Sequence, residues 1–140
     1  MAQQNFSAAV DKWVLETRQR MIAVFRTAAQ FVVEDVIERT PVDTGYARAS
    51  WTVSLDGPMP MRGAQGDGYQ APPYSLSIAG ADLGDTIYLS AVANYMGHLE
   101  YGARGRAGVG MVRLSAQAWP QHVAKAVAEA KARVASNVRG

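Results

Sequence analysis

Residues 40–51 read Thr40-Pro41-Val42-Asp43-Thr44-Gly45-Tyr46-Ala47-Arg48-Ala49-Ser50-Trp51, and they join two regions with different hydrophobic patterns. Before them, residues 6–39 carry apolar side chains at every third or fourth position, which predicts a helix. Residues 47–55 instead alternate between apolar and polar side chains, which predicts a strand. The helix should end before the proline, because the residue that precedes a proline avoids the α-helical region. We therefore predict a structural joint between the helix and the strand, formed by Pro41, Asp43, Thr44, Gly45, Arg48 and Trp51.

The predicted N-terminal helix is long for a chain of this size. Its apolar or near-apolar residues follow a heptad-like spacing of alternating four and three positions: Val10, Val14, Thr17, Met21, Val24, Ala28 and Phe31. At 1.5 Å per residue the helix would be roughly 50 Å long, whereas a compact chain of 140 residues has a radius of gyration of about 14 Å. We therefore expect the helix to extend beyond its own domain and to contact a partner. The alternative is a helix that is bent or broken near Thr27.

The middle of the chain predicts a small sheet and a long loop. Residues 56–73 contain four glycines and four prolines, which is typical of a loop. Loops of this length usually act as functional arms or are disordered in the free protein. Residues 74–79 and 86–92 are predicted strands, and the turn at 80–85 between them favours a hairpin.

The C-terminal third predicts two helices around a Gly-rich segment. Residues 93–101 fit a short helix that Gly102 ends, and residues 102–110 form a basic, flexible loop. A last helix is predicted from about Met111 to Asn137, and Pro120 should kink or split it. Its buried face would consist of Leu114, Trp119, Val123, Val127 and Val134.

These elements predict one α+β domain over residues 1–140. It would have a long N-terminal helix, a small antiparallel sheet of about three to four strands, a short helix and a C-terminal helix interrupted near Pro120. Flexible arms are expected at 56–73 and 102–110.

Composition excludes several classes of protein. The chain has 140 residues, of which 49% are hydrophobic and 19% charged, as in soluble globular proteins. It has no cysteine, which excludes disulfides, zinc–thiolate sites and thiol nucleophiles. No apolar run approaches the ~18 residues that a membrane span needs, and the N-terminus lacks the pattern of a secretion signal. We therefore expect no membrane partner.

Charge is concentrated near the C-terminus. The net charge of the chain is +2. Residues 103–140 hold seven Lys and Arg residues against one acidic residue, Glu129, so their own net charge is +6. Such a segment can contact a polyanion or an acidic protein surface, or it can be a solvated helix face.

No catalytic or metal-binding constellation emerges from the sequence. Asp43-Thr44-Gly45 matches the local motif of aspartic proteases, but a single copy would require a symmetric dimer, and no buried strand precedes it. The two histidines, His98 and His122, belong to no ligand spacing. We expect no enzyme activity, no cofactor and no metal.

Six blocks follow one another along the chain: Arg39–Gly45, Arg48–Trp51, Ala93–Tyr95, Leu99–Gly102, Gly110–Arg113 and Trp119–Pro120. Their order and spacing resemble a known family, the head–tail joining or tail-completion proteins of long-tailed phages. Minor tail protein Z of lambda-like phages belongs to the same broad group. The resemblance spans about residues 7–135, and loop 56–73 has no counterpart in it.

The resemblance implies a structural protein of the phage virion. Relatives act as rings, commonly of six copies, between the head connector or stopper protein and the tail terminator or tail tube protein. The expected location is the neck or tail of the virion, and the host cytoplasm during assembly. Contact with genomic double-stranded DNA in the channel would need only phosphate attraction. We expect contacts with a partner subunit or DNA at Tyr95, Glu100, Tyr101, Arg104, Arg106 and Arg113.

Two alternatives from other classes stay open. The first is a non-specific nucleic-acid-binding protein that uses the basic C-terminal segment. The second, more remote, is a dimeric aspartic protease that uses Asp43.

Overall fold

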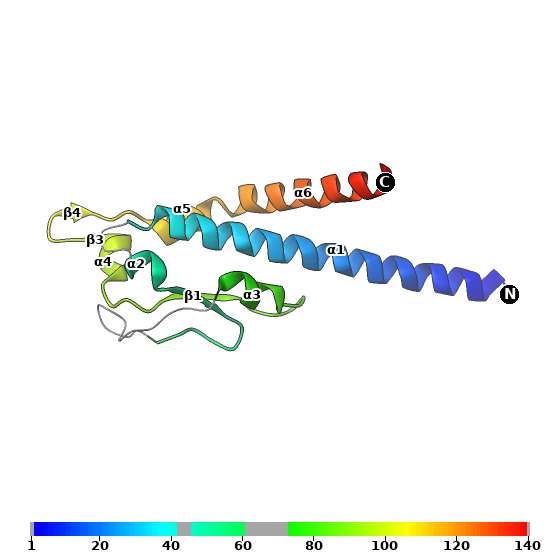
Figure 1. The fold of residues 1–140 in the computed structure, drawn as a ribbon, viewed down its shortest axis with the longest axis horizontal. Helices are drawn as coiled ribbons and strands as arrows, with labels where there is room; N and C mark the ends of the chain where they lie inside the picture. Colours follow the sequence, from blue (N-terminus) through cyan, green and yellow to red (C-terminus); the bar gives the residue numbers. More distant parts are fainter. Residues whose placement is uncertain (1, 42–45, 61–72, 140) are drawn as a thin grey trace.

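The computed structural model describes residues 2–41, 46–60 and 73–139. It has a mixed α+β fold in which α1 runs along most of the length of the molecule (Figure 1). The elements in chain order are α1 (Ala2–Arg39), α2 (Tyr46–Ala49), β1 (Trp51–Ser54), α3 (Tyr74–Ala79), β2 (Tyr88–Ala91), α4 (Met96–Tyr101), β3 (Gly102–Ala103), β4 (Arg106–Ala107), α5 (Met111–Gln117) and α6 (Trp119–Arg139).

Helix α1 is a single unbroken helix of 38 residues, so the alternative of a break near Thr27 is wrong. Its C-terminal half buries Ala28, Val33 and Val36 against the rest of the chain. Its N-terminal part extends past the end of α6 (Figure 1), and large apolar side chains there remain exposed. The expected extension of the helix beyond its own domain is therefore confirmed.

The sheet is smaller than predicted. β1 and β2 pair antiparallel, with Trp51 opposite Ala91 and Ser54 opposite Tyr88. A second pair, β3 and β4, joins Gly102 to Ala107 in a separate two-stranded hairpin. The described chain therefore has two two-stranded sheets instead of one sheet of three to four strands.

Two segments predicted as strands contain helix instead. Residues 74–79 form α3, in which Tyr74 and the fully buried Ile78 lie one turn apart and both face the core cluster of Val33 and Val53. The predicted hairpin with 86–92 is consequently wrong, and β2 pairs with β1 instead. Residues 46–49 form one helical turn, α2, which buries Ala47, so the first strand begins only at Trp51.

The second half of the chain follows the prediction more closely. Helix α4 ends at Tyr101, and Gly102 follows it with a φ of 94°. The C-terminal helical region divides at Ala118 into α5 and α6. Pro120 lies in the first turn of α6, where the lack of an N–H costs no helical hydrogen bond. The predicted interruption near Pro120 is thus confirmed.

The predicted buried face of this region needs correction. The residues that α5 and α6 bury are Met111, Ser115 and Ala126, whereas Leu114 and Trp119 are exposed. Val123 and Val127 are half-buried, and the side chain of Val134 lies outside the described part. Helix α6 runs antiparallel to α1 and packs along it (Figure 1), and Ala126 is its buried residue among those whose side chains are described.

Candidate functional site

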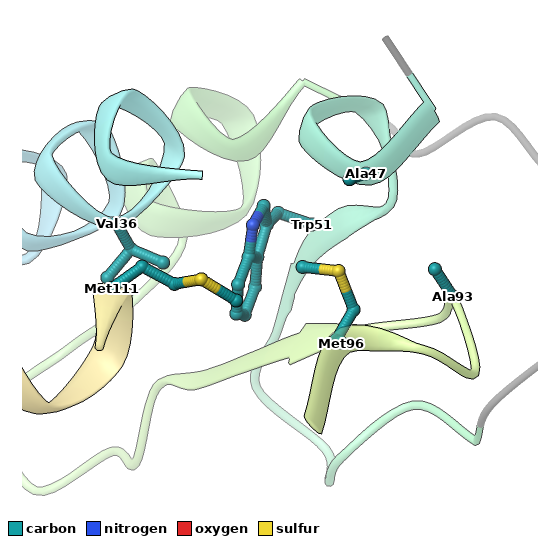
Figure 2. Packing of buried hydrophobic residues seen from close by; sticks show 6 residues of the cluster. All are labelled: Val36, Ala47, Trp51, Ala93, Met96 and Met111. Atoms are coloured by element: carbon teal, nitrogen blue, oxygen red, sulfur yellow. The ribbon is translucent and has the colours of Figure 1, made fainter. Parts of the chain in front are cut away.

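The junction between α1 and β1 is held by a buried hydrogen-bond chain. The indole Nε1 of Trp51 donates to the hydroxyl of Thr40 at 2.9 Å, and that hydroxyl donates to the carbonyl of Val36 at 2.7 Å. Thr40 is fully buried. Figure 2 shows the indole between Met111 and Met96, two further members of this core cluster. The last turn of α1 and the start of β1 are therefore fixed by both packing and hydrogen bonds.

Arg48 completes the junction from the other side. Its Nε donates to the carbonyl of Thr40 at 2.8 Å, and its Nη2 donates to the carbonyl of Glu38 at 3.0 Å. The last carbonyls of a helix lack intrahelical partners and carry partial negative charge. The guanidinium of Arg48 satisfies two of them and places a cation at the end of α1.

Three of the six predicted joint residues therefore lie at this junction. Arg48 and Trp51 make the contacts above, and Pro41 follows the last turn of α1. Asp43, Thr44 and Gly45 lie outside the described residues. Thr40, which the prediction did not single out, is the residue that both Arg48 and Trp51 contact.

Glu100 is the centre of a second network, at the start of α5. Its carboxylate accepts hydrogen bonds from the N–H groups of Val112 at 2.9 Å and Arg113 at 3.0 Å. Arg113 adds a bond from its Nε to the same carboxylate at 3.0 Å and a bond from its Nη2 to the Glu100 carbonyl at 2.6 Å. Burial alone would raise the pKa of Glu100, but these donors outweigh it and lower the pKa below its usual 4.5.

The predicted contact residues divide into separate groups. Glu100, Tyr101 and Arg113 lie together, because the guanidinium of Arg113 also stacks over the Tyr101 ring at 4.8 Å. The Tyr95 ring instead packs against Tyr46, with 6.4 Å between ring centroids. The Glu100 side chain is only 8% exposed, which leaves it little surface for a partner.

Arg104 and Arg106 lie in the hairpin that β3 and β4 form. Arg104 and Gly105 both have positive φ, 53° and 78°, as the central residues of a type I′ turn require. Both arginines are exposed. The hairpin lies at the end of the molecule opposite the N-terminus of α1 (Figure 1). The segment expected as a plain loop thus presents its cations on a defined turn.

A third polar cluster links α1 to α5 and α6. The Asp35 carboxylate lies 3.0 Å from Arg39 Nε and 3.4 Å from His122 Nε2, and Ser115 Oγ lies 3.5 Å from the same His122 nitrogen. Burial would raise the pKa of Asp35, but the hydrogen bond from Arg39, the nearby Ser115 hydroxyl and the neighbouring positive charges lower it below the usual 3.8. This cluster could not be predicted from the sequence, because Asp35 and Arg39 lie far along the chain from Ser115 and His122.

This cluster does not have the geometry of a catalytic triad. In a Ser–His–Asp triad the serine and the carboxylate bond to different nitrogens of the imidazole. Here Ser115 and Asp35 approach the same nitrogen, and Ser115 is fully buried. The arrangement ties three helices together and offers no accessible nucleophile.

Two apolar grooves lie beside α1. The first, of about 610 Å³, lies between α1 and the 85–89 segment, and the second, of about 500 Å³, lies between α1 and α6. Phe25 and Trp119 line both grooves, so they form one continuous apolar surface. Trp119, which was predicted to be buried, is exposed and lines both grooves.

The described residues hold no group of three or more His, Cys, Asp or Glu side chains suited to a metal ion. Within the same parts of the chain, no helix combines the length and the apolar character needed to cross a membrane. Comparison with known proteins finds no match: no protein-family model, no curated protein and no solved structure is significantly similar to this chain.

Proposed function

We propose that this protein is a structural component of the head–tail interface of a long-tailed phage. It would assemble as a ring, with six copies expected, that joins the DNA-filled head to the tail around the DNA channel. Its neighbours would be the head connector or stopper protein on one side and the tail terminator or tail tube protein on the other. The protein would thus belong to the virion neck, and to the host cytoplasm during assembly.

The observation that carries this proposal is the exposed apolar face of α1. The N-terminal part of the helix extends beyond the subunit and exposes Phe6, Trp13 and Met21 to solvent. Exposed apolar surface of this extent marks a protein–protein contact. A subunit of an assembly would need such a helix to contact its neighbours. The sequence blocks between residues 39 and 120, which resemble the phage family, support a phage neck as that assembly.

The basic groups support a role beside DNA or an acidic ring. Arg104 and Arg106 are exposed on the β3–β4 hairpin, and Lys125, Lys131 and Arg133 are exposed on α6. Such cations attract phosphates without reading base sequence, as a channel that passes any genome requires. Arg113 contributes less to this surface, because it is already bound to Glu100.

The test is electron microscopy of lysates from the parent phage with this gene disrupted. Filled heads and complete but unjoined tails support the proposal. Normally joined particles would contradict it. An Arg104→Ala/Arg106→Ala variant, compared with Arg18→Ala on the exposed surface of α1, tests whether the hairpin cations are needed for joining.

A second candidate is a non-specific nucleic-acid-binding protein, favoured by the same exposed cations on α6 and the hairpin. It predicts that the purified protein binds double-stranded DNA of any sequence, with an affinity that falls steeply as salt rises. Binding that is absent at low salt removes this candidate. The aspartic protease alternative depends on Asp43, which lies outside the described residues, and no described residue supports it.

A further inference from the structure

The N-terminal part of α1 carries an apolar stripe with no covering element in the described chain. Its members are exposed and recur at helical spacing on one side of the helix: Phe6, Val10, Trp13, Val14 and Met21. Phe6 is 73% exposed and Trp13 is 64% exposed. Leu15 is also exposed, but helical geometry places it on the opposite side of α1. We refer to the five residues as the overhang stripe.

The overhang stripe continues into the groove between α1 and α6. Met21, which ends the stripe, lines this groove together with Val24 and Phe25 of α1 and Trp119, Val123 and Val127 of α6. The groove of about 500 Å³ has an almost wholly apolar surface. One molecule therefore presents both an exposed apolar helix face and an unfilled apolar groove between two helices.

We propose that the overhang stripe of a second copy of this chain lies in the groove between α1 and α6. The chain cannot fill its own groove, because α1 is unbroken from Ala2 to Arg39. At 1.5 Å per residue, Phe6 is held about 27 Å from Val24. Only another copy, or another protein, can bring such a stripe to the groove.

The spacing of the stripe indicates that its partner is a helix. The stripe members Phe6, Val10, Val14 and Met21 follow one another at intervals of four, four and seven residues, as in helices that pack side by side. The groove supplies two helices as its walls. The overhang stripe of one copy would therefore lie in the groove of another copy. This one contact would bury two apolar surfaces that are exposed in the single chain.

The area involved is sufficient for a stable contact. The exposed parts of the five stripe residues amount to roughly 500 Å², since an aromatic side chain carries about 150–250 Å² and Phe6 and Trp13 are mostly exposed. With the flanking polar residues, this approaches the ~800 Å² per partner of a typical specific interface. The contact adds to the proposed function the two surfaces through which neighbouring subunits would bind. It rests on that function only for the claim that repeated contacts of this kind close into a ring.

Sedimentation velocity of the purified full-length chain tests the contact. The wild-type protein should associate beyond the 15.0 kDa of one copy. Trp13→Ser should raise the apparent dissociation constant roughly tenfold or more, as the loss of a central aromatic anchor does. The matched control is Leu15→Ser, which alters an equally accessible apolar residue on the other side of α1 and should leave association unchanged. A wild-type protein that stays monomeric up to about 1 mM, or a Trp13→Ser protein that associates normally, overturns the proposal.

Photo-crosslinking locates the contact. The natural chain has no cysteine, so Phe6→Cys gives a single position for a benzophenone–maleimide label. Between copies, the label should react with Trp119, Val123 or Val127 of the groove, and the same label on Leu15→Cys should not. Crosslinks from Phe6→Cys that avoid the groove would overturn the proposed site.

These results are separable from the proposed function. A protein that associates through the groove yet is dispensable for joining heads to tails would contradict the phage role alone. A monomeric protein that nevertheless restores joining would contradict the subunit contact alone.

Discussion

The Trp51 indole donates a hydrogen bond to the Thr40 hydroxyl at 2.9 Å, so two residues eleven positions apart fix the end of α1 to the start of β1. Thr40 is fully buried, and its hydroxyl in turn donates a hydrogen bond to the Val36 carbonyl. In the same junction, Arg48 binds the carbonyls of Glu38 and Thr40. These bonds hold the C-terminal end of α1 at the start of β1, while α6 packs along the same helix.

Thr40→Val should destabilise the protein by about 1–3 kcal/mol, because it leaves the Trp51 N–H buried without its acceptor while keeping the side-chain shape. Urea unfolding of Thr40→Val, Trp51→Phe and the double variant measures the coupling between the two residues. We expect a coupling free energy of about 1 kcal/mol. Strictly additive effects would mean that the bond contributes nothing to stability.

Arg48→Ala should lower the free energy of unfolding by about 1 kcal/mol, since two carbonyls at the end of α1 lose a charged donor. Arg18→Ala is the matched control, because Arg18 forms an exposed pair with Asp82 at 3.8 Å and such pairs contribute little. Chemical denaturation of both variants is the measurement. Equal effects from the two substitutions would contradict the role assigned to Arg48.

Acid should destabilise the protein through Glu100. Its pKa in the folded state is lowered below 4.5, so the network contributes stability above that pH and loses it as the pH falls through the lowered folded value. Asp35, whose pKa is also lowered, acts in the same direction below about 3.8.

Glu100→Gln should therefore be less stable than the wild type at neutral pH and show a weaker loss of stability on acidification. Urea midpoints measured from neutral pH down to about pH 3 give the comparison. The control is Glu129→Gln, which removes a carboxylate from the surface of α6 and leaves the buried network intact. A Glu100→Gln protein with the full acid dependence of the wild type would refute this assignment.

Two glycines of the α4 region should respond in opposite ways. A Cβ on Gly102 would lie 2.6 Å from the Arg106 carbonyl oxygen, and the φ of 94° disfavours any side chain. Gly102→Ala should therefore cost about 2 kcal/mol or more. Gly97 lies within α4 with open space around it, so Gly97→Ala should stabilise the helix by up to about 1 kcal/mol. Thermal unfolding of the two variants is the measurement, and a shift of the same sign in both would contradict the structure.

The long-range periodicity of α1 made its prediction dependable. The stripe from Val10 to Phe31 is sustained over about six turns, which favours a helix strongly over a strand, and Pro41 marks the end of the helix. The split of the C-terminal helix could likewise be predicted from Pro120, and the end of α4 from Gly102.

The short segments could not be assigned in the same way. Residues 74–79 are too few for the two-residue periodicity of a strand to be distinguished from the 3.6-residue periodicity of a helix. In the structure they form a helix, in which Ile78 packs against Val33 and Val53. The turn at Arg104-Gly105 was missed because arginine is uncommon at positive φ.

Most of the candidate site depends on contacts across the fold. The bonds of Glu100 to Val112 and Arg113 and the approach of His122 to Asp35 join residues whose sequence spacing carries no motif. The joint is the exception: Arg48 and Trp51 were predicted to act together near Pro41, and the structure brings both to Thr40.

The most direct test of the central claim is restoration of joining with purified protein. Lysates of the phage lacking this gene would be incubated with the wild-type chain, and joined particles would be counted by electron microscopy. The proposed function predicts that filled heads and free tails become joined, infectious particles when the protein is added. Heads and tails that are already joined without it, or that stay separate after it is added, would contradict a role in head–tail joining.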